Sequence, residues 1–311
     1  MRDAPGPFPA RDGFVPVIGG RLYWRSLGAR RDPTILAVHG GPSEHGYLRF
    51  LEDLVPEGYR VVWYDQWGCG RSTRGPVPPG YGPNEAAQHT ERVRRSLRLG
   101  RPFLFGHSWG GAVALAAVAQ FPRSYAGALL CGAFASEPSF VTAMHQHLAT
   151  LPASIRIPIE AGERSGRIAT AAYRRAVRRR RATYSQGIQV LPLEFRATEA
   201  NLNRSLLRSI YGEPRRLLGP TTGTLAAWDV RPQLRRVRLP TLLLAGEREA
   251  GRFTALELHR LWPHAKLVIV PGAAHLPFYS ARDRFLSEVL SFLRRARMGA
   301  PTDRRRLQQR A

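Results

Sequence analysis

The fold of this chain is decided by the stretch Phe103-Leu104-Phe105-Gly106-His107-Ser108-Trp109-Gly110-Gly111. It holds the pattern Gly-x-Ser-x-Gly, with an apolar run before it and an Ala-rich run without Gly or Pro after it, at 112–120. Strand, sharp turn and helix are the context of a nucleophile elbow, a turn that exposes a serine hydroxyl above a sheet. Small neighbours are needed because the serine backbone is strained and tightly packed. We predict that Ser108 is a nucleophile; the alternative is a buried serine in a glycine-rich turn.

Composition indicates one large domain or a core with an inserted subdomain, since the chain has 311 residues and is 43% hydrophobic. No apolar run approaches the ~18 residues of a membrane span, and residues 1–7 lack the apolar segment of a secretory signal. We therefore expect a cytoplasmic protein with no membrane partner. Cys69 and Cys131 are its two cysteines, expected as free thiols.

The net charge of +24 comes almost entirely from arginine, since Lys266 is the only lysine. The arginines are spread along the chain, with dense runs only at 174–181 and 294–310, beside 30 Gly and 25 Pro. This pattern is more typical of a coding bias than of a polyanion site. No RNA- or DNA-binding motif accompanies the charge, so we expect no specific nucleic-acid partner, only weak salt-dependent binding to acidic surfaces.

Short apolar runs alternate with helical patterns and predict an α/β fold with a mostly parallel sheet covered on both faces. An irregular arm at 1–13 and a hairpin at 14–18 and 22–25 come first. Helices are expected at 84–99, with Asn84 as the N-cap, and at 109–120, 254–262 and 281–297. The predicted buried strands are Thr34–Val38, Val61–Tyr64, Pro102–Phe105, Ala126–Cys131, Thr241–Ala245 and Leu267–Val270.

The alternation stops between residues 137 and 229, where Arg-rich amphipathic segments such as Ile168–Tyr184 replace the strands. We predict a helical cap at 137–229 inserted between a first core part, 1–136, and a second, 230–297. Ligands of such sheets bind at the carboxyl ends of the strands, so the cap is expected over the site. Residues 298–311 are polar and basic and are expected to be a disordered tail.

A serine hydroxyl needs a base to take its proton and a third group to orient that base. His275 is the leading base, because it lies in a loop of small residues directly after the last predicted strand. His259 and His264 are alternatives, but they fall on and just after a helix.

The acid is less sharply defined. Glu249 lies three residues beyond the glycine that ends the fifth predicted strand, where the chain can reach a histidine. Glu247 is only one residue off that strand, and Glu137 lies just past the fourth strand. No aspartate occurs between positions 65 and 229, which narrows the choice. Glu249 is preferred, and Glu137 and Glu247 stay open.

Acyl transfer also requires an oxyanion hole, a pair of N–H groups for the developing negative charge. The backbone N–H of Trp109, directly after the nucleophile, is one candidate donor. The other is Gly41, in the loop His39-Gly40-Gly41-Pro42 that follows the first buried strand. A plain glycine turn is the alternative explanation for that loop.

Three blocks together resemble the proline iminopeptidases of the α/β-hydrolase superfamily: His39–Pro42, Asp65-Gln66-Trp67-Gly68-Cys69-Gly70-Arg71-Ser72, and Gly106–Gly111. The second block is the most specific of the three. The resemblance runs from about residue 14 to residue 295. A weaker match in the cap covers Leu193-Glu194-Phe195, Asn201, Thr222–Leu225 and Trp228-Asp229.

This resemblance implies the α/β-hydrolase fold, with Ser108, Glu249 and His275 as the catalytic triad. Gly41 and Trp109 take the oxyanion-hole roles. It implies release of an N-terminal residue, often proline, from a short peptide, without a cofactor or a metal.

The chain departs from the family pattern at three places. Ser43 follows Pro42 where the family usually has glycine, and the acid is Glu249 where the family usually has aspartate. The family also holds the free amine of its substrate with glutamates in the cap. Glu194 matches one of them, while the block around Glu213 is rearranged and basic, and its arginines would repel a cationic amine.

The sequence thus supports a serine hydrolase acting through an acyl-enzyme on a small molecule or short peptide, first of all a prolyl-type aminopeptidase. The alternative keeps the machinery but takes an ester, lactone or non-peptide amide, favoured by the basic cap if the substrate carries a carboxylate. A non-catalytic binding protein of the same fold is a minor alternative. A serine at position 108 disfavours epoxide- or haloalkane-opening chemistry, and the sequence does not define the oligomeric state.

Overall fold

The computed structural model describes residues 8–185, 188, 192–213 and 216–298. Of the predicted tail at 298–311, only Met298 falls within the described residues, and it ends the last helix. None of the described helices is long and apolar enough to cross a membrane.

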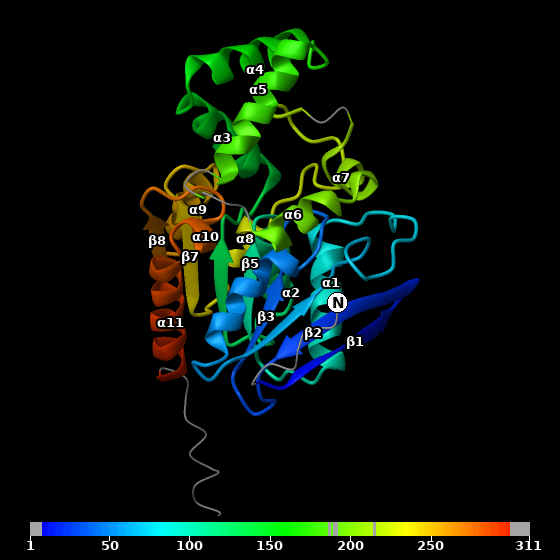
Figure 1. Ribbon diagram of the computed structural model, residues 1–311, viewed down its shortest axis with the longest axis vertical. Helices are drawn as coiled ribbons and strands as arrows, with labels where there is room; N and C mark the ends of the chain where they lie inside the picture. Colours follow the sequence, from blue (N-terminus) through cyan, green and yellow to red (C-terminus); the bar gives the residue numbers. More distant parts are fainter. Residues whose placement is uncertain (1–7, 186–187, 189–191, 214–215, 299–311) are drawn as a thin grey trace, which may run out of the picture.

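A single sheet with the strand order β1-β2-β4-β3-β5-β6-β7-β8 forms the centre of the molecule (Figure 1). The first two strands and β4 pair antiparallel, and all later pairings are parallel. The predicted α/β class is therefore confirmed. The strands are β1 (Ala10–Val17), β2 (Gly20–Leu27), β3 (Thr34–Val38), β4 (Arg60–Tyr64), β5 (Phe103–His107), β6 (Gly127–Cys131), β7 (Thr241–Gly246) and β8 (Lys266–Val270).

Strands β3 to β7 are buried on both faces, and successive side chains of each strand point to opposite sides of the sheet. In β3, Leu36 and Val38 join one core cluster, while Ile35 and Ala37 join the other. The first cluster includes side chains of α1 (Pro83–Ser96), α2 (Trp109–Gln120), α8 (Arg231–Leu234) and α9 (Gly251–Leu261). The second includes the 3-10 segment η1 (Gly46–Leu54), α10 (Pro277–Ser280) and α11 (Arg282–Met298).

Most predicted boundaries are shifted by one to three residues, and two of the differences have a clear physical reason. Strand β1 begins at Ala10, inside the expected irregular arm. The prediction missed this start because the first residues of β1 are exposed at the edge of the sheet and carry no apolar pattern. Helix α1 is capped at Gly82, not at Asn84. Pro83 fills the first helical position, and Glu85 reaches back to accept the Gly82 N–H at 3.1 Å.

The helices between Ser136 and Asp229 lie above the carboxyl ends of the parallel strands, where Figure 1 shows α3, α4 and α5 stacked beyond the sheet. The chain leaves and re-enters the core at one point, since Ser136 and Asp229 form an isolated antiparallel bridge. The elements in between are α3 (Glu137–Ala149), α4 (Ala153–Ser165), α5 (Ala171–Ala182), η2 (Thr183–Ser185), α6 (Leu193–Ala200) and α7 (Arg204–Tyr211). A small apolar cluster of their own, with Ile159 and Tyr173 at its centre, joins α4 to α5.

Candidate active site

The turn between β5 and α2 holds Ser108 in a strained backbone conformation, with φ 55° and ψ −122°. Such a conformation is rare outside glycine and persists only where the surroundings impose it. The flanking glycines explain how. A Cβ on Gly106 would collide with the carbonyl of Gly110, and one on Gly110 would collide with the carbonyl of Val38. The glycines of the motif therefore let β5, α2 and β3 approach closely enough to fix the serine.

Glu249 and His275 come together at the carboxyl ends of β7 and β8. The His275 Nδ1 lies 2.5 Å from the Glu249 Oε2, and Glu249 is only 1% exposed against 20% for the imidazole. The backbone N–H of Gly246 donates to the other carboxylate oxygen at 2.9 Å. Since Nδ1 is taken by the carboxylate, Nε2 is the ring nitrogen left for the cavity that both His275 and Ser108 line.

The alternative acids and bases lie elsewhere. Glu137 accepts the backbone N–H of Thr221 at 2.7 Å. Glu247 is exposed and accepts a backbone N–H of the loop after β8 at 2.8 Å. His259 belongs to α9. His264 lies between α9 and β8, and its ring contacts the ring of Trp262. None of the four lines the cavity beside Ser108.

The two candidate oxyanion donors are Gly41, in the loop after β3, and Trp109, directly after Ser108. Gly41 lines the same cavity as Ser108 and has φ 53°, a left-handed conformation that suits glycine. Trp109 is the first residue of α2, so its backbone N–H has no acceptor inside the helix. The helix dipole adds partial positive charge at this end, which favours an oxyanion there.

One buried network joins the three sequence motifs. Gln66 donates its side-chain N–H to the His39 carbonyl at 2.6 Å and its backbone N–H to His39 Nε2 at 3.0 Å. Its side-chain oxygen accepts the indole N–H of Trp109 at 3.0 Å. Burial lowers the pKa of His39 to about 4, so this imidazole is neutral and its Nδ1–H donates to the Gly40 carbonyl at 3.1 Å. The network fixes the Gly40–Gly41 loop against the start of α2, a role that sequence spacing did not reveal.

The Asp65 block has a structural role next to this network. The Asp65 carboxylate accepts the backbone N–H of His45 at 3.0 Å, that of Arg71 at 2.9 Å, and the His45 ring at 2.7 Å. Burial raises the pKa of Asp65, but these hydrogen bonds and the nearby histidines outweigh it, and the net shift is downward. A Cβ on Gly70 would collide with the same carboxylate, which explains why glycine stands there.

A second hydrogen-bond chain, here called the relay, runs through Tyr47 and His107. It joins the end of β5 to the loop that holds Gly40 and to the loop that holds His275. The Tyr47 hydroxyl accepts the Gly40 N–H at 2.6 Å and lies 2.8 Å from His107 Nδ1. Burial first, and the nearby His275 second, lower the pKa of His107 far below its ordinary value. The neutral ring therefore accepts the Tyr47 proton at Nδ1 and donates Nε2–H to the His275 carbonyl at 2.9 Å. Sequence reasoning missed this relay, although His107 stands inside the Gly-x-Ser-x-Gly motif.

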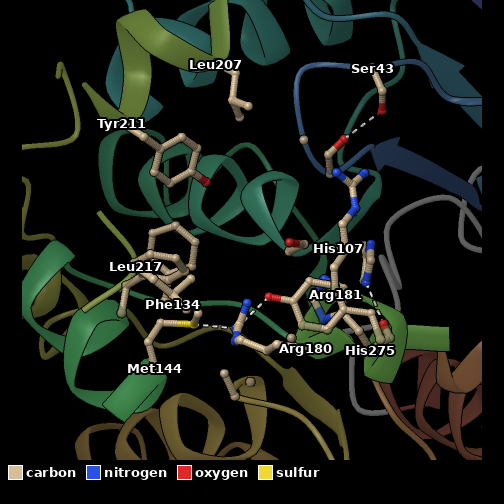
Figure 2. Close-up of a pocket in the computed structure, with 18 of the residues that line it drawn as sticks. Ser43, His107, Phe134, Met144, Arg180, Arg181, Leu207, Tyr211, Leu217 and His275 are labelled. Atoms are coloured by element: carbon tan, nitrogen blue, oxygen red, sulfur yellow. Dashed lines mark hydrogen bonds between the residues drawn. The ribbon is translucent and has the colours of Figure 1, made fainter. Parts of the chain in front are cut away.

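The cavity above Ser108 has a volume of about 380 Å³ and an apolar lining contributed by the core and the cap. Figure 2 shows Phe134, Met144, Leu207, Tyr211 and Leu217 around it. Its charged lining residues are three arginines, Arg180, Arg181 and Arg216. Among the residues that the structure describes, no aspartate or glutamate lines this cavity.

Neither cap glutamate suggested by the sequence lies with Ser108. Glu194, on α6, is half-buried; burial first, and the Glu194 charge second, raise the pKa of Tyr279 on the core side. Glu213 is 64% exposed and forms an ion pair of 3.4 Å with Arg208. Neither is part of the cavity lining, so the structure does not bring these carboxylates to the position of a substrate amine beside the elbow.

The two cysteines, Cys69 and Cys131, are free and buried, and burial raises the pKa of both thiols. In the part of the chain that the structure describes, no cluster of three or more His, Cys, Asp or Glu side chains is arranged to hold a metal ion.

The elbow, the Glu249–His275 pair and the parallel sheet are the features of an α/β hydrolase, and residues 33–281 match the family described as alpha/beta hydrolase fold. The chain belongs to this family and is a hydrolase of that fold. A proline iminopeptidase of Thermoplasma volcanium is 29% identical over 293 residues, which cover 91% of this chain and 96% of the relative. One of Saccharolobus solfataricus is 26% identical over 288 residues, covering 91% and 92%.

A crystal structure of proline iminopeptidase from Mycobacterium smegmatis matches with a TM-score of 0.83 at 24% identity, over 93% of this chain and 100% of that chain, and shows a shared fold. The predicted resemblance to proline iminopeptidases is therefore confirmed.

Proposed function

We propose that the chain is a serine hydrolase that acts through an acyl-enzyme and releases an N-terminal, prolyl-type residue from a short peptide or amide. The observation that carries the proposal is the strained Ser108 in one cavity with a histidine whose Nδ1 is held 2.5 Å from a buried carboxylate. The choice of reaction follows from the proline iminopeptidases among its relatives.

In the proposed mechanism, His275 Nε2 takes the proton of Ser108 as the hydroxyl attacks the substrate carbonyl. The N–H groups of Gly41 and Trp109 stabilise the oxyanion that forms. His275 then gives the proton to the leaving amine, and the same nitrogen activates water to hydrolyse the acyl-enzyme. Glu249 stays ionised throughout, holds the tautomer with the proton on Nδ1 and stabilises the imidazolium.

A fluorophosphonate probe tests the nucleophile. Wild-type protein should be labelled and Ser108→Ala should not, while Ser43→Ala, which removes another hydroxyl of the same cavity, should keep its label. Hydrolysis of prolyl and alanyl arylamides, followed in the same three proteins, tests the aminopeptidase reaction. If wild-type protein is never labelled, the catalytic proposal is wrong and a non-catalytic binding protein of this fold takes its place.

A second candidate function keeps the machinery but replaces the peptide by an ester, a lactone or a non-peptide amide. The observation in its favour is the cavity lining, where arginines stand and no described carboxylate offers a partner for a free amine. Short-chain p-nitrophenyl esters assayed beside the arylamides separate the two. Turnover of esters alone refutes the aminopeptidase proposal and supports this one.

A further inference from the structure

Arg180 is a buried cation in the wall of the cavity without a described counter-charge. Its side chain projects from α5 and is only 4% exposed, yet no ion pair joins it to any aspartate or glutamate that the structure describes. A buried charge without a partner is strongly unfavourable, because water that would solvate it has been removed. Such a group calls for an explanation, and the simplest explanation is a ligand whose negative charge pairs with the guanidinium.

The contacts of Arg180 leave hydrogen-bonding capacity unused. Its Nη2 donates to the Tyr184 hydroxyl at 2.8 Å and lies 3.1 Å from the Met144 sulfur, as the dashed lines in Figure 2 show. Its Nε is buried and has no partner. A guanidinium carries five N–H donors in a planar fork that matches a carboxylate. Two contacts with neutral atoms thus leave donors for an anion that enters the cavity.

Glu163, a buried carboxylate of the cap, is already used by other groups. Glu163 accepts the Tyr173 hydroxyl at 2.6 Å and the backbone N–H of Leu217 at 2.7 Å, and pairs with Arg216 at 3.2 Å. Burial first, and then the nearby Arg180, His275 and Arg252, lower the pKa of His147 to about 4. Glu163 therefore neutralises Arg216, while the surroundings of Arg180 stay positive.

Arg180 lies next to the candidate base. The Tyr184 ring packs on the His275 ring with centroids 4.8 Å apart, and the backbone N–H of His275 donates to the Tyr184 carbonyl at 3.2 Å. Arg180 binds the hydroxyl of that same tyrosine. In acyl transfer the histidine protonates the leaving group, so the leaving group occupies the side of the cavity that the histidine faces. Arg180 is on that side, one side chain beyond the base.

We propose that Arg180 binds a carboxylate carried by the leaving group of the substrate. The inference rests on the proposed acyl-enzyme function. It narrows the substrate class to small molecules whose released part is an acid, and for peptides it means dipeptides, whose C-terminal carboxylate is close to the scissile bond. Longer or amidated peptides lack an anion at that distance and are poorer substrates.

A matched pair of substrates tests the proposal directly. Pro-Gly and Pro-Gly-amide share the scissile bond and differ only in the carboxylate, and released proline can be measured for both. Wild-type kcat/KM should favour Pro-Gly by about 10- to 100-fold, the range for a hydrogen bond to a charged group. If only esters are cleaved, 4-acetoxybenzoate and its methyl ester give the same comparison.

Arg180→Met should abolish this preference by lowering kcat/KM for the carboxylate-bearing member of the pair to the level of the neutral member. Arg179→Met, an exposed position on the same helix, is the matched control and should keep the preference. Equal wild-type rates for the two members overturn the proposal. So does a preference that survives in a folded Arg180→Met protein. Should Arg180→Met not fold, Arg180→Lys keeps the charge but loses the planar fork and should weaken the preference for Pro-Gly, and an unchanged preference in Arg180→Lys overturns the proposal.

The failure of the proposed function looks different. In that case wild-type protein is not labelled by the neutral fluorophosphonate and cleaves neither member of either pair. Loss of discrimination between the pair, in an Arg180→Met protein that still reacts with the neutral fluorophosphonate, is expected only if the arginine recognises the anion. A purely structural role would lower labelling and both hydrolysis rates together.

Discussion

Replacing Glu249 by glutamine changes one atom of the candidate triad and removes its charge without altering its shape. In the structure, one carboxylate oxygen accepts the Gly246 N–H at 2.9 Å and the other lies 2.5 Å from His275 Nδ1. A glutamine can satisfy only one of these two donors. With its oxygen toward Gly246, its NH₂ faces Nδ1, which must then become an acceptor and move the ring proton to Nε2.

That tautomer cannot take a proton from Ser108. In triads of this kind, the corresponding replacement of the acid by its amide lowers kcat about 10⁴-fold, so Glu249→Gln should lower it about 10³- to 10⁴-fold. The opposite rotamer places NH₂ against the Gly246 N–H, and two buried donors facing each other cost about 1–3 kcal/mol of folding stability. The first rotamer should therefore prevail, with a large loss of activity and a small loss of stability.

The assay is kcat/KM for the best substrate found, with thermal unfolding of the same samples. Glu137→Gln is the matched control, because its side-chain oxygen can keep the hydrogen bond from the Thr221 N–H and it lies outside the cavity. That control should stay within about threefold of wild type. Glu249→Gln activity within tenfold of wild type, or a larger loss in Glu137→Gln, would refute the assignment and place the acid after the fourth parallel strand.

Three further predictions concern positions around the elbow. Tyr47→Phe leaves the Gly40 N–H and His107 Nδ1 without their partner; it should cost about 2–5 kcal/mol in denaturant unfolding and lower kcat more than it raises KM, and an unchanged kcat would contradict the relay. Gly111→Ala places a Cβ against Ala133 and should destabilise by about 1–3 kcal/mol, checked by thermal unfolding beside an exposed substitution on the same helix. Burial lowers the pKa of His147 from 6.5 to about 4, so between these pH values the unfolded chain binds one more proton, and the free energy of unfolding should fall as pH drops from 6.5 to 4. In denaturant unfolding at several pH values, His147→Leu should make the slope of this free energy against pH shallower by about 1.4 kcal/mol per pH unit. An unchanged slope would show that this imidazole does not titrate on unfolding.

Local patterns predicted the parts of the molecule that short stretches define. The apolar runs of β3 to β7 are buried on both faces, so each run is continuous and visible without knowledge of the rest of the chain. The elbow is equally local, since Ser108 and its flanking glycines are neighbours in sequence. The His275 and Glu249 positions followed from strand ends, because parallel strands bring their carboxyl ends to one edge.

Contacts between distant segments could not be read in the same way. Tyr47 stands in an ordinary apolar segment, and only the fold carries its hydroxyl to His107, 60 positions away. Gln66 was noticed as part of a motif, but its bonds to His39 and Trp109 depend on three strands lying side by side. The environment of Arg180 likewise depends on how the cap helices pack. In the sequence, Arg180 is only one member of a run of arginines.

The bridge between Ser136 and Asp229 has a consequence for how such a protein can change. Because the chain departs from and returns to neighbouring backbone positions, the order and register of the strands do not depend on the length or content of the segment between them. The candidate catalytic residues at the strand ends and the cap above them can therefore diverge at separate rates during evolution. Exchange of residues 137–229 between relatives should move substrate choice from one enzyme to another as a cassette, with the chemistry left in place.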